Sequence, residues 1–188
     1  MKNKRTIAIF TGNRAEFGLQ YPILQAINEH KDLEYKLIVS GAHLEKDFGE
    51  TLNEIQKDGF KISAEIKIDS SQNVLSFTPI AIADCAKKMA EELLKIKPNM
   101  VVIYADRYEA FGALIASTQM NIPTAHIEGG DLTEGGALDD SVRHAMTKLA
   151  HLHFTTNAEA SKRLIAMGEE KWRVHTVGYP TIDLIKKA

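Results

Sequence analysis

Short apolar runs alternate with amphipathic stretches along almost the whole chain. The runs are rich in β-branched residues and are only a few residues long, which is typical of strands buried on both faces of a parallel sheet. Between them, apolar residues recur at the spacing that places them on one side of a helix. Strands are expected at residues 6–11, 35–40, 60–68, 101–104, 124–127, 152–155 and 174–177. Helices are expected at residues 21–29, 50–58, 79–96, 108–118, 141–150, 158–167 and from 181 onward.

This regular β-α alternation predicts an α/β fold with a Rossmann-like, doubly wound parallel sheet. The run at 60–68 alternates apolar and polar residues instead of being continuously apolar, so we expect it nearer the sheet edge. A length of 188 residues suits a single domain with a substantial core.

Composition narrows the functional classes. With 44% hydrophobic residues, 26% charged residues and a net charge of -2, the chain reads as a soluble globular protein, and nothing in its charge favours nucleic acid or an anionic membrane as partner. The single cysteine, Cys85, excludes an internal disulfide and a cysteine-cluster metal site, and its apolar neighbours predict a buried thiol. The first apolar run is too short for a signal peptide, and no run approaches the length of a membrane span. We therefore expect a cytoplasmic protein.

Carboxylates follow two of the predicted strands directly. Asp106 comes after the run at 101–104, and Glu128 comes after the run at 124–127. In an open α/β sheet the ligand crevice lies at the carboxyl ends of the strands, so these acids are placed to face a substrate. Asp106 has a structural alternative, because Asp106 and Glu109 in DRYE fit a helix-capping pattern, and capping is favoured when the motif is taken alone.

A further pair of acids, Asp139 and Asp140, precedes the predicted helix at 141–150. One of the two is expected to cap this helix, which leaves the other free to act. Several carboxylates around one cleft suit proton transfer, because repulsion and partial burial separate their pKa values and let one act as acid while another acts as base.

The loop at 12–18, GNRAEFG, resembles a phosphate-binding turn. Its glycines permit close backbone approach, a helix follows, and Arg14 adds a fixed positive charge. The loop lacks the GxGxxG pattern of dinucleotide sites and the lysine of a Walker loop, which disfavours bound NAD and P-loop chemistry. The alternative is an ordinary β-α turn in which Arg14 and Glu16 are solvated.

Histidines are the remaining candidates for chemistry. His43 lies after the second strand, where it meets a sugar, a phosphate or only solvent, and His126 and His144 flank the acidic region. His151 and His153 form an HxH pair, which in a strand places both rings on one face. Because no third ligand lies nearby, we expect no metal site.

Eight motifs carry a family resemblance across nearly the whole chain. In chain order they are TGNRAEFG, SGAHLEKDFG, NEIQKDGFKI, ADRYEA, HIEGG, LDDSVRH, HLHFTTN and HTVGYPTID. With them the chain resembles the amino-terminal half of the hydrolysing UDP-N-acetylglucosamine 2-epimerases. The resemblance implies one half of the two-domain B-type glycosyltransferase-like fold. It also implies a reaction in which UDP is eliminated to give a 2-acetamidoglucal, which water converts into the C2-epimeric free sugar.

The resemblance also implies site residues, with no metal and no cofactor. The catalytic acids are Asp106, Glu128 and Asp139, without individual roles, because neighbouring acids titrate together. The substrate-binding residues are Gly12, Arg14, His43, Arg107 and His144. The chain departs from the usual form between HIEGG and LDDS, where Gly135 and Gly136 lengthen the segment.

The family's second, UDP-binding domain has no counterpart in these 188 residues. We therefore expect residues 1–180 to form the amino-terminal catalytic domain and residues 181–188 to begin an interdomain helix of a longer protein, which forms a homo-oligomer when full length. The fragment alone is expected to bind the UDP-sugar weakly and to be inactive. Two alternatives stay open: a non-hydrolysing 2-epimerase, which returns UDP to the glycal, and a non-catalytic module for nucleotide-sugar binding or subunit contact.

Overall fold

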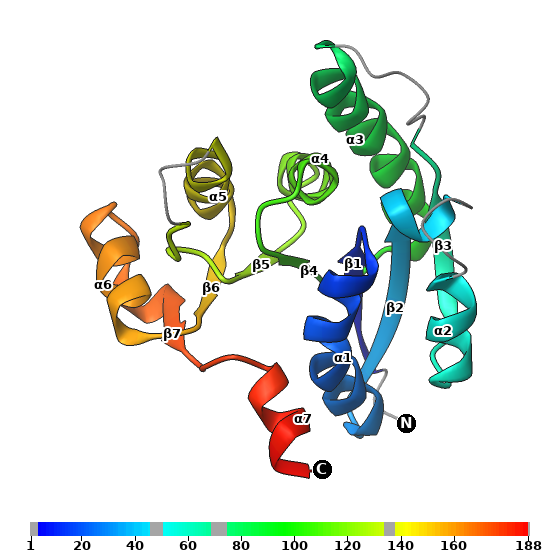
Figure 1. The fold of residues 1–188 in the computed structure, drawn as a ribbon, viewed down its shortest axis with the longest axis horizontal. Coiled ribbons are helices and arrows are strands. Elements are labelled where there is room, and N and C mark those ends of the chain that lie inside the picture. The colour runs from blue at the N-terminus through cyan, green and yellow to red at the C-terminus, as the bar shows by residue number, and fades with distance from the viewer. Residues whose placement is uncertain (1–3, 46–50, 69–74, 134–137, 188) are drawn as a thin grey trace.

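A computed structural model describes residues 4–45, 51–68, 75–133 and 138–187, and Figure 1 shows a single parallel sheet at its centre. The strands are β1 (Arg5–Thr11), β2 (Leu33–Ser40), β3 (Ile62–Ile66), β4 (Met100–Tyr104), β5 (Thr124–Ile127), β6 (Leu152–Thr155) and β7 (Val174–Thr176). Their order is β3-β2-β1-β4-β5-β6-β7, and every neighbouring pair is parallel. The order runs both ways from β1 and β4, so the doubly wound sheet predicted from the sequence is confirmed, with β3 at an edge.

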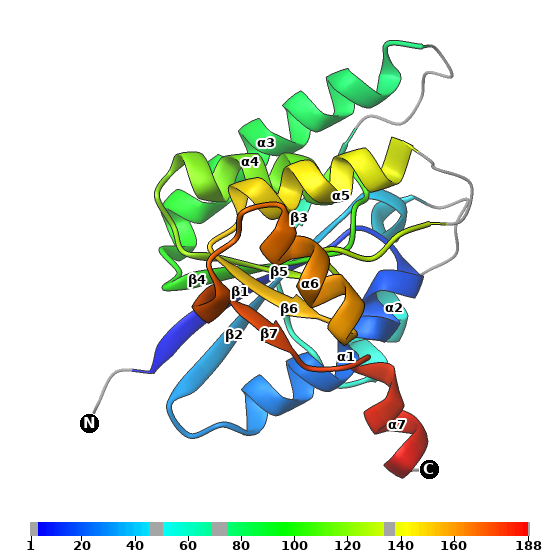
Figure 2. The same cartoon turned by 90° about the vertical axis from the view of Figure 1, so that its left-hand side faces the viewer.

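Helices cover both faces of the sheet. They are α1 (Arg14–Glu29), α2 (Thr51–Lys57), α3 (Phe77–Ile96), α4 (Tyr108–Gln119), α5 (Leu138–Leu149), α6 (Ala158–Ala166) and α7 (Thr181–Lys187), with 3-10 turns η1 (Gly41–Leu44) and η3 (Lys171–Arg173). Figure 2 shows α3, α4 and α5 on one side of the sheet and α1 and α2 on the other. None of the helices in the described ranges is long and apolar enough to cross a lipid bilayer.

The central strands are buried on both faces, as their continuous apolar runs predict. Alternate residues enter two separate cores, and Phe10 and Ile103 pack with α3 and α4 while Ile9 and Val102 pack with α1. Cys85 on α3 belongs to the first core, and its thiol donates to a backbone carbonyl of α4 at 3.2 Å. The predicted buried thiol is therefore confirmed.

Helix α1 begins earlier than its apolar spacing indicates. Asn13 caps it, because its side-chain oxygen accepts from the backbone N–H of Glu16 at 3.0 Å. The Glu16 carboxylate reaches back to the N–H of Gly12 at 2.8 Å, so a reciprocal cap replaces most of the expected loop at 12–18. Only Gly12 and Asn13 separate β1 from α1. The phosphate-binding loop expected at 12–18 is therefore wrong in form, since Arg14 lies in the first turn of a helix.

Helix α5 also begins earlier than expected, at Leu138. Asp139 and Asp140 consequently lie in its first turn and neither is a residue before the helix, so the expected division into one cap and one free acid is wrong. Two sequence expectations fall outside the described residues: the lengthening by Gly135 and Gly136, and the start of the second helix at residue 50.

Candidate active site

The two acids that follow β4 and β5 lie on backbone in an unfavourable conformation. Ala105, just before Asp106, has a φ of 54°, and Glu128 itself has a φ of 65°. Left-handed backbone costs a residue with a side chain roughly 1–2 kcal/mol, and such conformations gather at functional sites. The strain therefore supports the sequence prediction that the carboxyl ends of β4 and β5 form a site.

Asp106 is held by an arginine from α5. Arg143 donates to the Asp106 carboxylate with Nη2, while its Nη1 donates to the backbone carbonyl of Asp131 at 2.7 Å and to Oδ1 of Asp140 at 3.1 Å. The N-cap of α4 is Arg107, which makes no side-chain capping bond. The capping alternative for Asp106 is therefore wrong, because its carboxylate turns towards α5 instead of the start of α4.

Burial makes Asp106 a weaker acid than an ordinary aspartate. Desolvation raises its pKa, the neighbouring Arg143 charge opposes this, and the charges of Asp139 and Asp140 raise it further. Asp139 is exposed, yet it lies close enough to Asp106 to influence its titration. The structure thus brings Asp139 close enough to Asp106 for their charges to interact.

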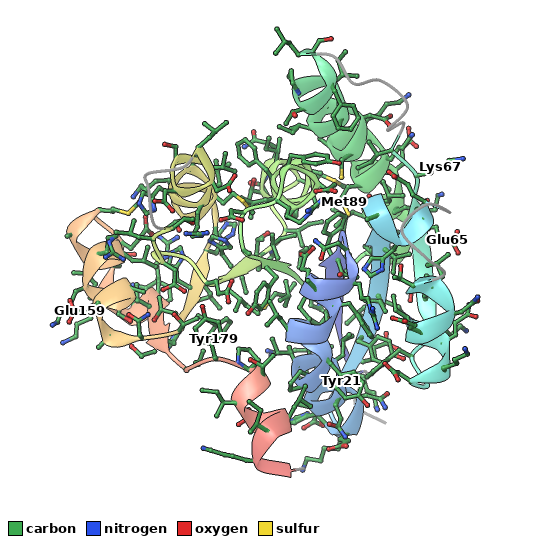
Figure 3. All side chains as sticks on the ribbon, in the orientation of Figure 1. Tyr21, Glu65, Lys67, Met89, Glu159 and Tyr179 are labelled. Carbon is green, nitrogen blue, oxygen red and sulfur yellow. The ribbon has the colours of Figure 1, made fainter. Side chains whose placement is uncertain are left out.

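Glu128 is the acid of the neighbouring loop. The buried Tyr104 hydroxyl donates to Glu128 Oε1 at 2.7 Å. Burial raises the pKa of Glu128, and the Tyr104 hydrogen bond opposes this. The pKa of Tyr104 is raised by burial and then by the Glu128 charge, so its phenol stays a donor. Tyr179, labelled in Figure 3 between β7 and α7, has a pKa raised first by burial and then by the same Glu128 charge.

A buried histidine links the loops of both acids. His126 is fully buried, and its Nε2 lies 2.7 Å from the Ala105 carbonyl. A carbonyl can only accept, so Nε2 carries the proton, and Nδ1 is left to accept from the Thr147 hydroxyl at 3.4 Å. Burial lowers the pKa of His126 to about 4, which keeps the ring neutral at physiological pH. His126 therefore fixes the backbone that carries Asp106.

The glycines after Glu128 are required by close packing. Gly130 has a φ of 86°, and a Cβ there would lie 2.7 Å from the Ala160 carbonyl of α6. Arg163 donates to the Gly130 carbonyl, and Asp131 accepts from the Thr156 hydroxyl at 2.7 Å. The loop bearing Glu128 is thus anchored to the end of β6 and to α6.

A cleft lies at the ends of β1 and β2 and at the start of α4. It has a volume of about 590 Å³, and the two arginines of the sequence prediction, Arg14 and Arg107, both line it. Arg14 forms an exposed ion pair with Glu54 at 2.8 Å, while Arg107 pairs with the buried Glu109 at 2.8 Å. The other lining residues are Asn13, Ala15, Ala42, Glu45, Thr51, Phe77 and Tyr108.

His43 lies beneath this cleft and not on its surface. It is 2% exposed, with Nε2 3.1 Å from the Thr11 hydroxyl and Nδ1 3.0 Å from the Thr51 hydroxyl. Burial lowers its pKa to about 4, so the ring is neutral. The expected contact of the His43 ring with a sugar, a phosphate or solvent is therefore wrong, because the ring is enclosed, and its neighbour Thr51 lines the cleft instead.

The other predicted binding residues differ in their accessibility. The Gly12 amide is already occupied by Glu16 Oε2 at 2.8 Å. His144 on α5 is half-buried, and its Nδ1 is buried with no hydrogen-bond partner among the described residues. Neither group is therefore open to a ligand: Glu16 occupies the Gly12 amide, and His144 Nδ1 is buried.

The HxH pair does not share a ligand. His151 Nδ1 accepts from the backbone N–H of Thr124 at 3.1 Å, whereas the buried His153 faces Glu169 Oε2 at 3.0 Å through Nε2. Within the part of the chain that the structure describes, no three His, Cys, Asp or Glu side chains are grouped as a metal site would need.

Sequence reasoning missed two residues of the acid site. Arg143 follows Asp140 by three residues on α5. This is the spacing of ion pairs along a helix, so the sequence itself indicates that Arg143 can pair with an acid of this site. Tyr104 ends an apolar run typical of a buried strand, so nothing in the local pattern indicates that its hydroxyl meets Glu128.

Glu16 contradicts the expectation of a solvated turn and leads to a prediction. It is 4% exposed, and burial raises its pKa to about 8, opposed by the Gly12 hydrogen bond and reinforced by the charge of Glu109. Between its unfolded pKa near 4.5 and about 8, the folded state holds a proton that the unfolded chain has lost. Stability should therefore fall as the pH rises through this window.

We expect Glu16→Gln to remove this pH dependence, because the amide oxygen still accepts from Gly12 and cannot ionise. At pH 8 the variant should melt at least about 3 °C above the wild type, with little difference at pH 5. Thermal unfolding at both pH values measures this. Glu65→Gln, at the exposed glutamate of β3 labelled in Figure 3, is the control. Equal melting temperatures of Glu16→Gln and wild type at pH 8 would contradict the prediction.

Comparison with known proteins supplies the family. The family model described as UDP-N-acetylglucosamine 2-epimerase matches residues 25–188. The chain is 39% identical to the GDP/UDP-N,N'-diacetylbacillosamine 2-epimerase (hydrolyzing) of Campylobacter jejuni, over 98% of this chain and 47% of the relative. It is 37% identical to a UDP-N-acetylglucosamine 2-epimerase of Neisseria meningitidis, over 97% and 47%. It is 35% identical to the UDP-N,N'-diacetylbacillosamine 2-epimerase (hydrolyzing) of Legionella pneumophila, over 96% and 48%. The chain thus spans about half the length of these relatives.

Solved structures show the same fold. A crystal structure of the UDP-GlcNAc 2-epimerase of N. meningitidis bound to UDP-GlcNAc matches with a TM-score of 0.84 at 18% identity, covering 97% of this chain and 49% of that one. A structure of the Methanocaldococcus jannaschii enzyme in complex with UDP-GlcNAc and UDP matches with a TM-score of 0.82 at 18% identity, covering 97% and 50%. The expected half of a B-type glycosyltransferase-like fold is confirmed. With its family model matched over most of its length, the chain belongs to the UDP-N-acetylglucosamine 2-epimerase family.

Proposed function

We propose that this chain is the catalytic amino-terminal domain of a hydrolysing nucleotide-sugar 2-epimerase. Its substrate would be UDP-N-acetylglucosamine or a UDP-2,4-diacetamido sugar, and its products UDP and the free sugar with inverted C2. The observation that carries the proposal is the pair Asp106 and Glu128, half-buried acids with raised pKa values at the ends of adjacent strands. Two relatives at 39% and 35% identity are named as hydrolyzing, which supports the hydrolytic outcome.

The proposed reaction has two stages, and each needs proton transfer. First, a carboxylate removes the C2 proton while the C1–O bond breaks, so that UDP leaves with the bonding electrons and a 2-acetamidoglucal forms. Water then adds its hydroxyl to C1, and a proton returns to C2 from the opposite face. A carboxyl group with a raised pKa is a stronger base when it is ionised. It also keeps its proton up to a higher pH, so it can act as an acid nearer neutral pH. Asp106 and Glu128 have raised pKa values, and together with Asp139 they are proposed to share these steps.

The departing diphosphate needs positive charge. Arg14 and Arg107 line the cleft at the ends of β1 and β2, and the half-buried His144 lies on α5. We propose that these residues contact the UDP-sugar and that a second domain, outside residues 1–188, supplies further contacts to the nucleotide. The full protein is proposed to form a homo-oligomer and to act in the cytoplasm, without a metal or other cofactor.

Product analysis tests the proposal. The two-domain polypeptide would be incubated separately with UDP-N-acetylglucosamine and with UDP-2,4-diacetamido-bacillosamine, followed by proton NMR and mass detection. Free epimeric sugar with UDP is the expected result. An epimeric UDP-sugar would support the non-hydrolysing alternative, which the plain 2-epimerase name of the N. meningitidis relative favours. Binding of the nucleotide-sugar without turnover would support a non-catalytic module.

A further inference from the structure

A buried acid beneath the cleft has no part in the proposed elimination. Glu109, in the first turn of α4, is fully buried. Arg107 donates to both of its oxygens, from Nε to Oε2 at 3.1 Å and from Nη2 to Oε1 at 2.8 Å. A buried carboxylate is tolerated only when it is paired, and a fork of two parallel bonds fixes the relative orientation of both groups.

The surrounding backbone holds Glu109 in place. Gly41, with a φ of 54°, leaves room for it, because a Cβ there would lie 2.6 Å from Glu109 Oε1. A Cβ on Gly12 would lie 3.5 Å from Glu109 Cδ. The ends of β1 and β2 therefore close around this carboxylate, and its position is set by the sheet itself.

Glu16 is the other acid beside Gly12, and its charge state matters for Arg107. Because burial raises the pKa of Glu16 to about 8, it is mainly protonated at neutral pH. Arg107 thus faces one carboxylate charge at close range, that of Glu109, to which it is directly bonded.

One edge of the Arg107 guanidinium remains for the cleft. Its side chain is 41% exposed and lies over the Tyr108 ring, with Cζ 5.6 Å from the ring centroid. The bonds to Glu109 use Nε and Nη2, so Nη1 is outside this fork. Arg14 lines the same cleft. A fixed guanidinium binds an anion with less loss of side-chain entropy than a mobile one.

We propose that Glu109 is a positioning residue, which fixes Arg107 so that its free edge receives the diphosphate of the UDP-sugar. This inference rests on the proposed function and deepens it. Glu109 touches neither the sugar nor the reacting atoms in this arrangement. Its loss should therefore weaken nucleotide binding far more than it slows the chemical step, whereas a purely structural role would affect both through loss of folded protein.

The test measures UDP affinity by calorimetry, and KM and kcat, in the two-domain polypeptide. Glu109→Gln keeps the size of the side chain and removes its charge. We expect UDP to bind about tenfold more weakly and KM to rise by a similar factor, with kcat changed by less than about threefold. In a double-mutant cycle, Arg107→Gln with Glu109→Gln should bind UDP no more weakly than Arg107→Gln alone. Glu159→Gln, which removes an exposed ion pair on α6 (Figure 3), is the matched control.

Two results would overturn the inference: wild-type UDP affinity in folded Glu109→Gln, or fully additive losses in the cycle. If Glu109→Gln does not fold, Arg107→Lys replaces it, because lysine keeps the charge and cannot form the fork. An affinity loss of about tenfold in Arg107→Lys supports the inference, and wild-type affinity overturns it. Absence of UDP binding by the wild type overturns the inference, and absence of turnover overturns the proposed function. If the wild type turns over normally and Glu109→Gln binds UDP with wild-type affinity, the inference about Glu109 is wrong and the proposed function stands.

Discussion

Asp106→Asn is expected to lower kcat for sugar release by at least about a hundredfold in the two-domain polypeptide. The amide has the shape of the carboxylate and can still accept from Arg143, but it cannot take up or return a proton. The affinity for UDP should change little, since Asp106 faces Arg143 and α5 while the arginine-lined cleft lies at the ends of β1 and β2. Initial rates by proton NMR and UDP titration by calorimetry give the two quantities.

Matched variants separate loss of chemistry from loss of structure. Glu128→Gln and Asp139→Asn should each lower kcat by at least about a hundredfold, because both residues belong to the three proposed catalytic acids. Asp84→Asn removes a surface ion pair with Lys88 on α3 and should leave kcat unchanged. A near-normal kcat in Asp106→Asn would remove Asp106 from the catalytic set.

The fold was predictable because it depends on local pattern and on one topological rule. Apolar runs buried on both faces identify parallel strands, and β-α alternation leads to a doubly wound sheet. Because the carboxyl ends of parallel strands lie at one edge of the sheet, the sequence alone predicts that Asp106 and Glu128 lie close together. The structure confirms that both acids follow paired strands.

The partners of these acids were not predictable in the same way. Whether Asp106 caps α4 or binds Arg143 depends on how α5 packs beside α4. Arg143 lies 37 residues further along the chain than Asp106. The burial of His43 likewise depends on Thr51 of α2. Local spacing describes one element at a time, so it could not show that a polar side chain is enclosed by a second element.

The start of α1 shows a different failure. Apolar periodicity begins only at Tyr21, and Gly18 suggested a loop before it. Asn13 and Glu16, three residues apart, are a capping signal in the sequence itself, and the structure uses it. Here the information was local, but the glycines made the segment resemble a phosphate loop.

Arg143→Leu is expected to destabilise the protein by about 3 kcal/mol, because it leaves Asp106 buried without its cation and frees the carbonyl of Asp131. The side chains of Arg143 and Asp106 are only 11% and 15% exposed, so water can replace little of what is lost. For a chain of this size, the melting temperature should fall by at least about 6 °C. Arg143→Leu combined with Asp106→Asn should recover part of the loss, since the charge of Asp106 is then gone while Asp140 still lacks its arginine partner. Melting within about 2 °C of the wild type for Arg143→Leu alone would contradict the prediction.

The same variant distinguishes a structural from an electrostatic contribution of Arg143 to the reaction. Burial raises the pKa of Asp106, and the Arg143 charge opposes that rise. Without the arginine the pKa of Asp106 must rise further, so the ionised, basic form is populated only at higher pH. In Arg143→Leu, assayed below its melting temperature, the acidic limb of the kcat/KM profile should therefore move to higher pH, and some activity should return as the pH is raised. A profile that falls uniformly without moving would show that Arg143 only maintains the fold, because a change in Asp106 titration displaces the limb.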